Sequence, residues 1–152
     1  MTAVIRPAGE TDLPAVMAIE RAAFPTDAWS EAMMREAFAS GDAWVAEDGS
    51  GAVGYCALLA PAGSGDADVL TIAVAAEARR GGLGGALLAR MVETARARRA
   101  QRLFLEVRAD NPVAQHLYAT RGFEVVGRRP RYYQPDDVDA VVMRLDLTAV
   151  PA

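Results

Sequence analysis

The stretch over residues 69–91 constrains the fold most, because it reads as an apolar strand, a glycine-rich turn and an amphipathic helix in direct succession. Residues 69–74 form a short run rich in β-branched side chains, which is typical of a buried strand. Apolar residues then recur with the helical period at Leu87, Leu88, Met91, Val92 and Ala95. The chain therefore contains a strand that feeds directly into a core-facing helix.

Four glycines lie where this helix should begin, at Gly81, Gly82, Gly84 and Gly85. Glycine leaves backbone N–H groups accessible, and a helix N-terminus adds about half a positive charge. The turn therefore predicts an anion site that suits several phosphate oxygens, such as a pyrophosphate. A connection that binds nothing is the other interpretation, but each glycine there costs about 1 kcal/mol relative to alanine.

The sequence of this turn does not match two common phosphate-binding motifs. A Walker loop needs a lysine, and all 16 basic residues of the chain are arginine. A dinucleotide fingerprint needs a third glycine, but Leu87 occupies that position and no acidic residue ends a following strand at the right distance. The remaining pattern is Arg79-x-x-Gly82-x-Gly84 after an apolar strand.

The length and composition of the chain limit the number of domains and the kinds of fold that it can form. A chain of 152 residues suits one domain over residues 1–152 with a single core. No apolar run approaches the roughly 18 residues of a membrane span, so we expect no membrane association. The first residues show no basic segment followed by an apolar one, so we expect a cytoplasmic protein.

The scarcity of thiol and imidazole side chains argues against several chemistries. The single cysteine, Cys56, and the single histidine, His116, cannot form an internal disulfide or a zinc cluster, so we expect no metal. No G-x-S-x-G elbow is present, which disfavours a serine hydrolase. We expect Cys56 to be buried and His116 to be a packing or surface residue.

Charge is distributed unevenly along the chain. The net charge of −4 argues against nucleic-acid binding. Residues 1–78 hold 3 arginines against 12 acids, whereas residues 79–152 hold 13 arginines against 8 acids, so the predicted phosphate loop begins the basic half. The acidic half suits a cationic substrate such as a basic peptide, or it is simply a solvated surface.

Periodicity and turn residues predict eleven elements in the order β-α-α-β-β-β-α-β-α-β-β. The strands are expected at 3–6, 43–47, 53–59, 69–74, 102–107, 123–129 and 140–146, and the helices at about 11–23 with Thr11 as N-cap, 30–39 capped by Ser30, 84–98 and 113–120 ending at Gly122. Residues 48–51 indicate a hairpin and residues 132–137 a loop. Early hairpins with a central crossover predict an α/β fold with a mixed sheet and a right-handed crossover.

The motif Arg79-x-x-Gly82-x-Gly84 resembles the acetyl-CoA loop of the GNAT family of N-acetyltransferases, and the element order is that of the same three-layer fold. The series LEVR at residues 105–108, Asn111, Leu117-Tyr118 and Gly122-Phe123 is similar to the ribosomal-protein-alanine N-acetyltransferase branch of that family. The segments Phe24-Pro25 with Trp29-Ser30-Glu31 and Arg131-Tyr132-Tyr133 also resemble it. The resemblance implies acetyl-CoA as co-substrate.

Two side chains are candidates for proton transfer. Glu106 lies in an otherwise apolar strand, so it is either a partly desolvated general base or an outward-facing residue paired with Arg108 or Arg102. Tyr118, judged by spacing alone, is better explained as a core tyrosine. The resemblance implies that Glu106 accepts the proton through water, that Tyr118 protonates the CoA thiolate, and that Asn111 contacts CoA.

The resemblance also implies the binding residues. The backbone of Ile72, Ala73 and Val74 would bind the pantetheine arm, with Val74 N–H polarising the thioester carbonyl. The diphosphate would be held by the loop Arg79, Arg80, Gly81, Gly82, Leu83, Gly84 and Gly85. Trp29, Tyr132 and Tyr133 either line a peptide groove or cover the core.

The activity implied by the resemblance is acetylation of the N-terminal amine, on alanine, of a ribosomal protein by direct attack in a ternary complex. Two alternatives remain open. One is the same chemistry on a small amine such as a polyamine or an amino sugar, and the other is a non-catalytic module that senses acyl-CoA. We expect a monomer or a weak dimer.

Overall fold

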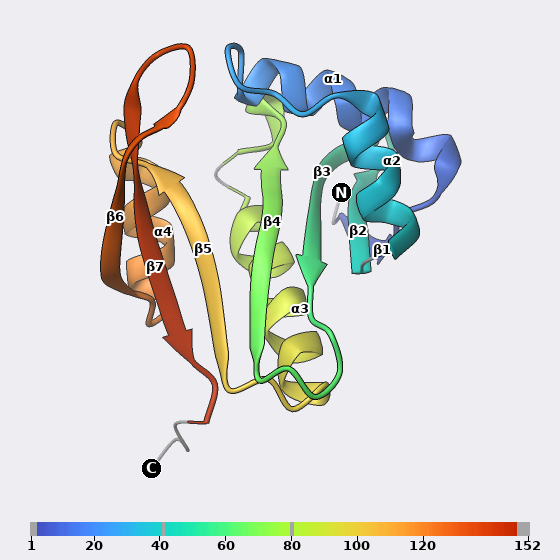
Figure 1. Ribbon diagram of the computed structural model, residues 1–152. Helices are drawn as coiled ribbons and strands as arrows, with labels where there is room; N and C mark the ends of the chain where they lie inside the picture. Colours follow the sequence, from blue (N-terminus) through green and yellow to red (C-terminus); the bar gives the residue numbers. More distant parts are fainter. Residues whose placement is uncertain (1–2, 41, 80, 149–152) are drawn as a thin grey trace.

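The computed structural model describes residues 3–40, 42–79 and 81–148, and within them the elements follow the predicted order (Figure 1). The strands are β1 (Val4–Pro7), β2 (Asp42–Asp48), β3 (Gly51–Leu59), β4 (Asp66–Val74), β5 (Arg102–Arg108), β6 (Glu124–Tyr133) and β7 (Val138–Asp146). The helices are α1 (Leu13–Ala23), α2 (Glu31–Ser40), α3 (Leu83–Ala97) and α4 (Pro112–Thr120). The mixed α/β fold is therefore confirmed.

One seven-stranded sheet forms the middle layer, in the order β1-β2-β3-β4-β5-β7-β6. Helices α3 and α4 lie behind this sheet in Figure 1, and α1 and α2 cover its other face at the β1–β4 end. Adjacent residues of one strand serve the two cores, since Val45 packs with α1 whereas Trp44 packs with α3. This alternation is the expected consequence of a strand buried on both faces.

The pair β4 and β5 is parallel, whereas the other neighbouring strands run antiparallel. Its register has three residue pairs, Asp66 with Arg102, Ala67 with Leu103 and Asp68 with Phe104. Beyond them the strands diverge, as the upper part of Figure 1 shows. The sheet is thus split along its middle, and peptide groups on facing strand edges lack a partner strand there.

Several predicted boundaries were wrong, among them the following three. The first helix begins at Leu13 and not at Thr11, because a 3-10 turn over Glu10–Asp12 precedes it and the Asp12 carboxylate accepts Gly9 N–H at 2.8 Å. Strand β4 begins at Asp66, where it pairs with β5, and so extends beyond the apolar run. Strand β6 continues to Tyr133, so the expected loop at residues 132–137 is shorter.

Two predicted helix caps were confirmed, and both depend on residues that are close in the sequence. Ser30 Oγ accepts Met33 N–H at 3.1 Å at the start of α2. Gly122 has a φ of +95°, the left-handed conformation expected after α4. Within the described ranges no helix is long and apolar enough to cross a bilayer.

Candidate active site

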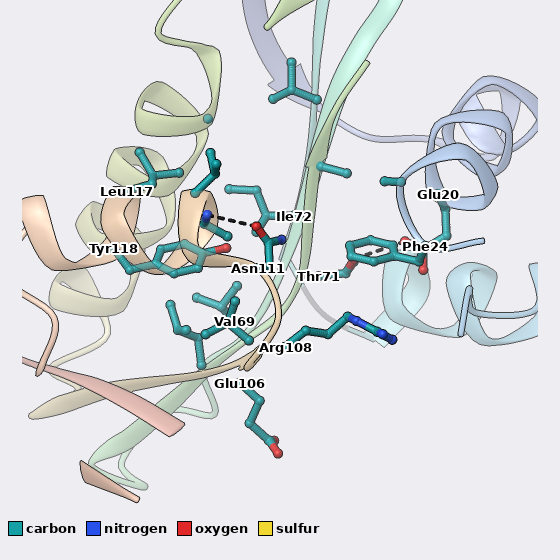
Figure 2. A pocket seen from close by; sticks show the side chains of 18 of the residues that line it. Glu20, Phe24, Val69, Thr71, Ile72, Glu106, Arg108, Asn111, Leu117 and Tyr118 are labelled. Carbon is teal, nitrogen blue, oxygen red and sulfur yellow. Dashed lines mark hydrogen bonds between the residues drawn. The ribbon is translucent and has the colours of Figure 1, made fainter. Parts of the chain in front are cut away.

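A cleft of about 860 Å³ occupies the split between β4 and β5. Residues of α3 and α4 line one end, including Gly84 and Tyr118, while Phe24 at the end of α1 and Trp29 in the following loop line the other. These helices lie on opposite faces of the sheet, so the cleft connects the two faces (Figures 1 and 2). Such a passage can bring together two ligands that enter from opposite sides.

The edge of β4 presents backbone donors to this cleft. Ala75 N–H donates to Val53 O of β3 at 2.8 Å, and successive peptide groups of a strand point to opposite edges. The N–H groups of Val74 and Ile72 therefore face away from β3, toward the split. All three predicted pantetheine residues, Ile72, Ala73 and Val74, line the cleft.

The start of α3 supplies a second set of backbone donors. Gly82 is the N-cap in the left-handed conformation, with φ +79° and ψ +9°, and the first helical hydrogen bond joins Ala86 N–H to Gly82 O at 3.0 Å. The N–H groups of Leu83, Gly84 and Gly85 consequently have no acceptor within the helix. The prediction of an anion site needs such a set of free donors at the positive end of a helix dipole.

The other loop residues differ in their relation to the cleft. Arg79 lines it, and its Nε donates to Val74 O at 3.2 Å. Gly81 is exposed and is not among the lining residues. Arg80, which we also expected to bind the co-substrate, lies outside the described residues.

Tyr118 projects from α4 into the part of the cleft behind the sheet (Figure 2). Its side chain is 7% exposed and packs against Phe123, with ring centroids 5.9 Å apart. Burial raises the pKa of Tyr118 to about 12, so the phenol stays protonated at neutral pH. No residue in the described ranges hydrogen-bonds its hydroxyl, which leaves that proton available to a ligand.

Asn111 is the N-cap of α4, and its Oδ1 accepts Ala114 N–H at 3.1 Å. The side chain lines the cleft beside Tyr118 and Ile72, as Figure 2 shows. Its amide nitrogen remains a donor that a ligand can use. One asparagine therefore both begins α4 and contributes a polar group to the cleft.

Glu106 lies on the opposite face of the sheet from Tyr118. Its neighbours in β5, Leu105 and Val107, are buried against the α3 core, so alternation directs Glu106 to the α1 face. In Figure 2 its carboxylate points away from Tyr118. The candidate acid and base thus flank the split from opposite sides.

The surroundings of Glu106 correct one sequence expectation, the identity of its ion-pair partner. The side chain is 31% exposed, so it is partly covered by the protein while water still reaches it. Its ion-pair partner is Arg129 of the edge strand β6, with Nε 3.1 Å from Oε2, rather than Arg108 or Arg102. A base at this position is accessible to water, which suits proton transfer through a solvent molecule.

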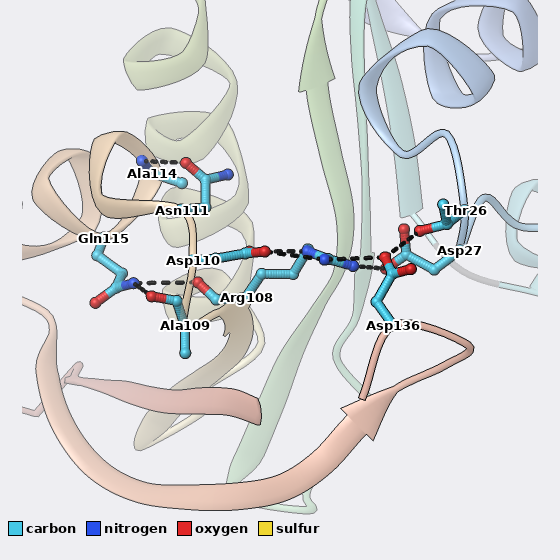
Figure 3. A network of polar contacts seen from close by, with 9 residues as sticks. All are labelled: Thr26, Asp27, Arg108, Ala109, Asp110, Asn111, Ala114, Gln115 and Asp136. Atoms are coloured by element: carbon cyan, nitrogen blue, oxygen red, sulfur yellow. Dashed lines mark hydrogen bonds and ion pairs between the residues drawn. The ribbon is translucent and has the colours of Figure 1, made fainter. Parts of the chain in front are cut away.

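A polar network around Arg108 lies on the α1 side of the cleft (Figure 3). Its guanidinium reaches Asp110 at 2.9 Å, Asp136 of the β6–β7 loop at 3.2 Å and Asp27 of the α1–α2 loop at 3.4 Å. Thr26 Oγ1 also donates to Asp136 at 2.6 Å. Two loops far apart in the sequence are therefore held together, with three carboxylates around one cation.

The three aromatic residues predicted for a peptide groove have different environments. Trp29 and Tyr133 line the cleft, and Trp29 also packs on the core beneath α1 and α2. Burial raises the pKa of Tyr133, and Arg108 lies 5.4 Å from its ring centroid. Tyr132 is 47% exposed, stacks edge-on against Tyr133 and is not a lining residue.

Glu20 is a cleft residue that the sequence analysis did not identify as functional. Although it is 1% exposed, its carboxylate accepts hydrogen bonds from Tyr55 O–H, from Thr71 Oγ1 at 3.1 Å and from Trp29 N–H at 3.0 Å. These donors join α1 to β3, β4 and the α1–α2 loop. The sequence did hold a signal for this residue, because Glu20 is an acid at a position on the apolar face of α1.

The Cys56 thiol and the possible metal ligands among the described residues show no arrangement suited to catalysis. Cys56 is buried, and burial raises the pKa of its thiol to about 12. Its Sγ lies 3.9 Å from Leu87 O, within the core. In the described part of the chain no group of three or more His, Cys, Asp or Glu side chains is arranged to hold a metal.

Known proteins resemble this chain in sequence and in fold. The family model described as the Acetyltransferase (GNAT) family matches residues 13–123. The [ribosomal protein bS18]-alanine N-acetyltransferase of Escherichia coli K12 is 38% identical over 85 residues, which are 55% of this chain and 57% of that protein. A putative enzyme of the same description from Bacillus subtilis is 38% identical over 90 residues, which are 59% of this chain and 58% of that protein.

The matched segments thus span little more than half the length of these curated relatives. A comparison of structures extends over almost the whole fold. The crystal structure of the ribosomal-protein-S18-alanine N-acetyltransferase from Escherichia coli matches with a TM-score of 0.83 and 28% identity, covering 98% of this chain and 96% of that chain.

Proposed function

Because the chain belongs to the Acetyltransferase (GNAT) family, as its sequence motifs indicated, we propose that it transfers an acetyl group from acetyl-CoA to the N-terminal amine of a protein. The acceptor we propose is a ribosomal protein that begins with alanine, by analogy with the relatives named above. Residues 1–152 would act as one acetyltransferase domain. The transfer is direct, with both substrates bound together.

The observation that carries this proposal is the polarity of the cleft. Behind the sheet it has the amide cradle of α3 and Arg79, which suit the phosphates of the co-substrate. On the α1 face Glu106 and the three carboxylates around Arg108 outnumber the two arginines that pair with them, Arg108 and Arg129, and this excess of negative charge suits a cationic amine. A ternary complex would therefore place donor and acceptor on opposite sides of the split.

The free donors also fit the co-substrate in shape. Gly82 adopts a left-handed conformation, and a Cβ added at Gly84 would stand 3.4 Å from Leu117 Cδ2, so glycine allows a ligand and α4 to approach the helix closely. When bound, acetyl-CoA supplies the acetyl group as a reactive thioester. The backbone of Val74 and its neighbours holds the arm that leads to this group.

Each proton that moves during the transfer is assigned to a residue of the cleft. Glu106 receives the proton of the acceptor ammonium through a water molecule on the α1 face. Val74 N–H stabilises negative charge on the carbonyl oxygen during the transfer. The Tyr118 hydroxyl donates its proton to the departing sulfur on the other face. Holding both substrates in one passage contributes the proximity on which such a transfer depends.

Mass spectrometry of peptides incubated with the protein and acetyl-CoA tests the acceptor class. We expect acetylation of the α-amine of peptides that begin with alanine, with little reaction on lysine side chains. Polyamines and amino sugars are measured in parallel. Faster turnover on those amines would reject the peptide acceptor, and absence of turnover on every amine, with intact CoA binding, would favour a sensing module.

Glu106→Gln tests the base while preserving side-chain size. We expect turnover to fall roughly 10²-fold to 10⁴-fold with CoA affinity nearly unchanged. Glu124→Gln is a matched control, since Glu124 is an exposed acid on the edge strand β6 and does not line the cleft. Equal activity of the two variants would remove Glu106 from the mechanism.

A further inference from the structure

Arg121 follows α4 and reaches across to the first turn of α3. A Cβ added at Gly85 would lie 1.8 Å from Arg121 Nη2 and 2.6 Å from Arg121 Cζ. The guanidinium therefore fills the hollow that the missing side chain of Gly85 leaves. This hollow adjoins the three N–H groups of Leu83, Gly84 and Gly85 that lack helical acceptors.

The charge of Arg121 is not neutralised by any carboxylate in the part of the chain that the structure describes. Within residues 3–40, 42–79 and 81–148 no carboxylate forms an ion pair with it, and its side-chain hydrogen bond goes to Thr120 Oγ1 at 3.4 Å. Arg108 and Arg129, also near the cleft, each hold a carboxylate. Arg121 is solvent-exposed and lines the cleft, so its donors are accessible to a ligand.

We propose that Arg121 binds the diphosphate of CoA jointly with the amides at the start of α3. A guanidinium offers two parallel N–H donors to phosphate oxygens, and the neighbouring amides offer further donors from the helix. Negative charge on both phosphates would then meet a side-chain cation and a helix N-terminus at one place. Gly85 has a second role here, because any larger residue would exclude the guanidinium.

This inference rests on the proposed use of acetyl-CoA, and calorimetric titration of CoA separates the two. We expect Arg121→Gln to weaken CoA binding roughly tenfold or more, the loss expected for a charge-assisted hydrogen bond. The control is Arg96→Gln, an equal loss of charge at an exposed residue near the other end of α3, about 16 Å along the helix. It should bind CoA as the unmodified protein does.

Four outcomes are decisive. Equal weakening of CoA and 3′-dephospho-CoA by Arg121→Gln supports a diphosphate contact. Weakening of CoA alone would assign Arg121 to the 3′-phosphate and overturn the proposal. Identical affinities for Arg121→Gln and Arg96→Gln would overturn it while leaving the proposed function intact. A lack of CoA binding by the unmodified protein would instead defeat the proposed function itself.

Gly85→Ala provides an independent check through the same hollow. Its methyl group would displace the flexible end of Arg121, so we expect CoA binding to weaken by a factor similar to that of Arg121→Gln. The double variant should bind no more weakly than Arg121→Gln alone. If Gly85→Ala weakens binding equally with and without Arg121, the methyl group acts on the ligand directly and the proposal fails.

Discussion

Replacing Tyr118 with phenylalanine separates catalysis from stability in this protein. The hydroxyl has no hydrogen-bond partner among the described residues, so its removal breaks no contact within the fold. The ring, which is 7% exposed and packs against Phe123, is retained. We therefore expect the free energy of unfolding to change by less than about 1 kcal/mol.

The expected effect on catalysis is much larger. Loss of a general acid costs roughly 10²-fold to 10⁴-fold in rate, which is about 2.7 to 5.4 kcal/mol in activation free energy. Because burial raises the pKa of Tyr118 to about 12, the unmodified protein should retain the protonated phenol throughout the neutral and mildly alkaline range. Ionisation of Tyr118 should therefore not limit the rate below about pH 11.

The assay is a single-turnover measurement of CoA release, which excludes effects on product release, combined with thermal unfolding of the same samples. Tyr132→Phe is the control, since Tyr132 is exposed and lies outside the cleft lining. A fall of less than about threefold for Tyr118→Phe, or equal rates in the two variants, would refute the acid role. A large loss of stability would contradict the structural premise.

Three further predictions concern the fold. Cys56 should react with thiol reagents only after unfolding, because burial raises the pKa of its thiol to about 12; rapid labelling of the native protein would contradict this. Met91→Ala should lower the unfolding free energy by about 2 to 5 kcal/mol in urea titrations, since Met91 is fully buried beneath the sheet. Hydrogen bonds from Arg6 lower the pKa of Asp12 in the folded protein. This carboxylate therefore stabilises the fold fully above its unfolded-state pKa of about 3.9, and it ceases to do so as the pH falls through its folded-state pKa. Asp12→Asn should therefore reduce stability at pH 7, and its difference from the unmodified protein should shrink below about pH 4; a constant difference would show that Asp12 does not titrate in this way.

Local signals predicted most of the architecture. The cap at Ser30, the left-handed Gly122 and the strand–turn–helix around Gly82 each depend on residues within one turn of one another, and each was confirmed. The order of elements followed from the same short-range periodicity. The start of β4 was missed because pairing with a distant strand decided it: Asp66 belongs to β4 because it faces Arg102.

The site was less accessible to sequence reasoning because its geometry depends on long-range contacts. The pairing of Glu106 with Arg129 arises from the position of β6 at the sheet edge, and no spacing along the chain encodes it. The environment of Glu20 combines donors from β3, β4 and the α1–α2 loop. Neither partner set can be found before the strand order is known.

The short register between β4 and β5 also affects how the protein is hydrated. Above Asp68 and Phe104 the facing peptide groups have no partner strand, so water must solvate those that lack a side-chain partner such as the one that Arg79 gives Val74 O. A ligand that carries its own amide groups can replace this water and complete the missing hydrogen bonds between the two halves of the sheet. Occupancy would then couple these halves mechanically, and amide hydrogen exchange along the two strand edges should slow when the passage is filled.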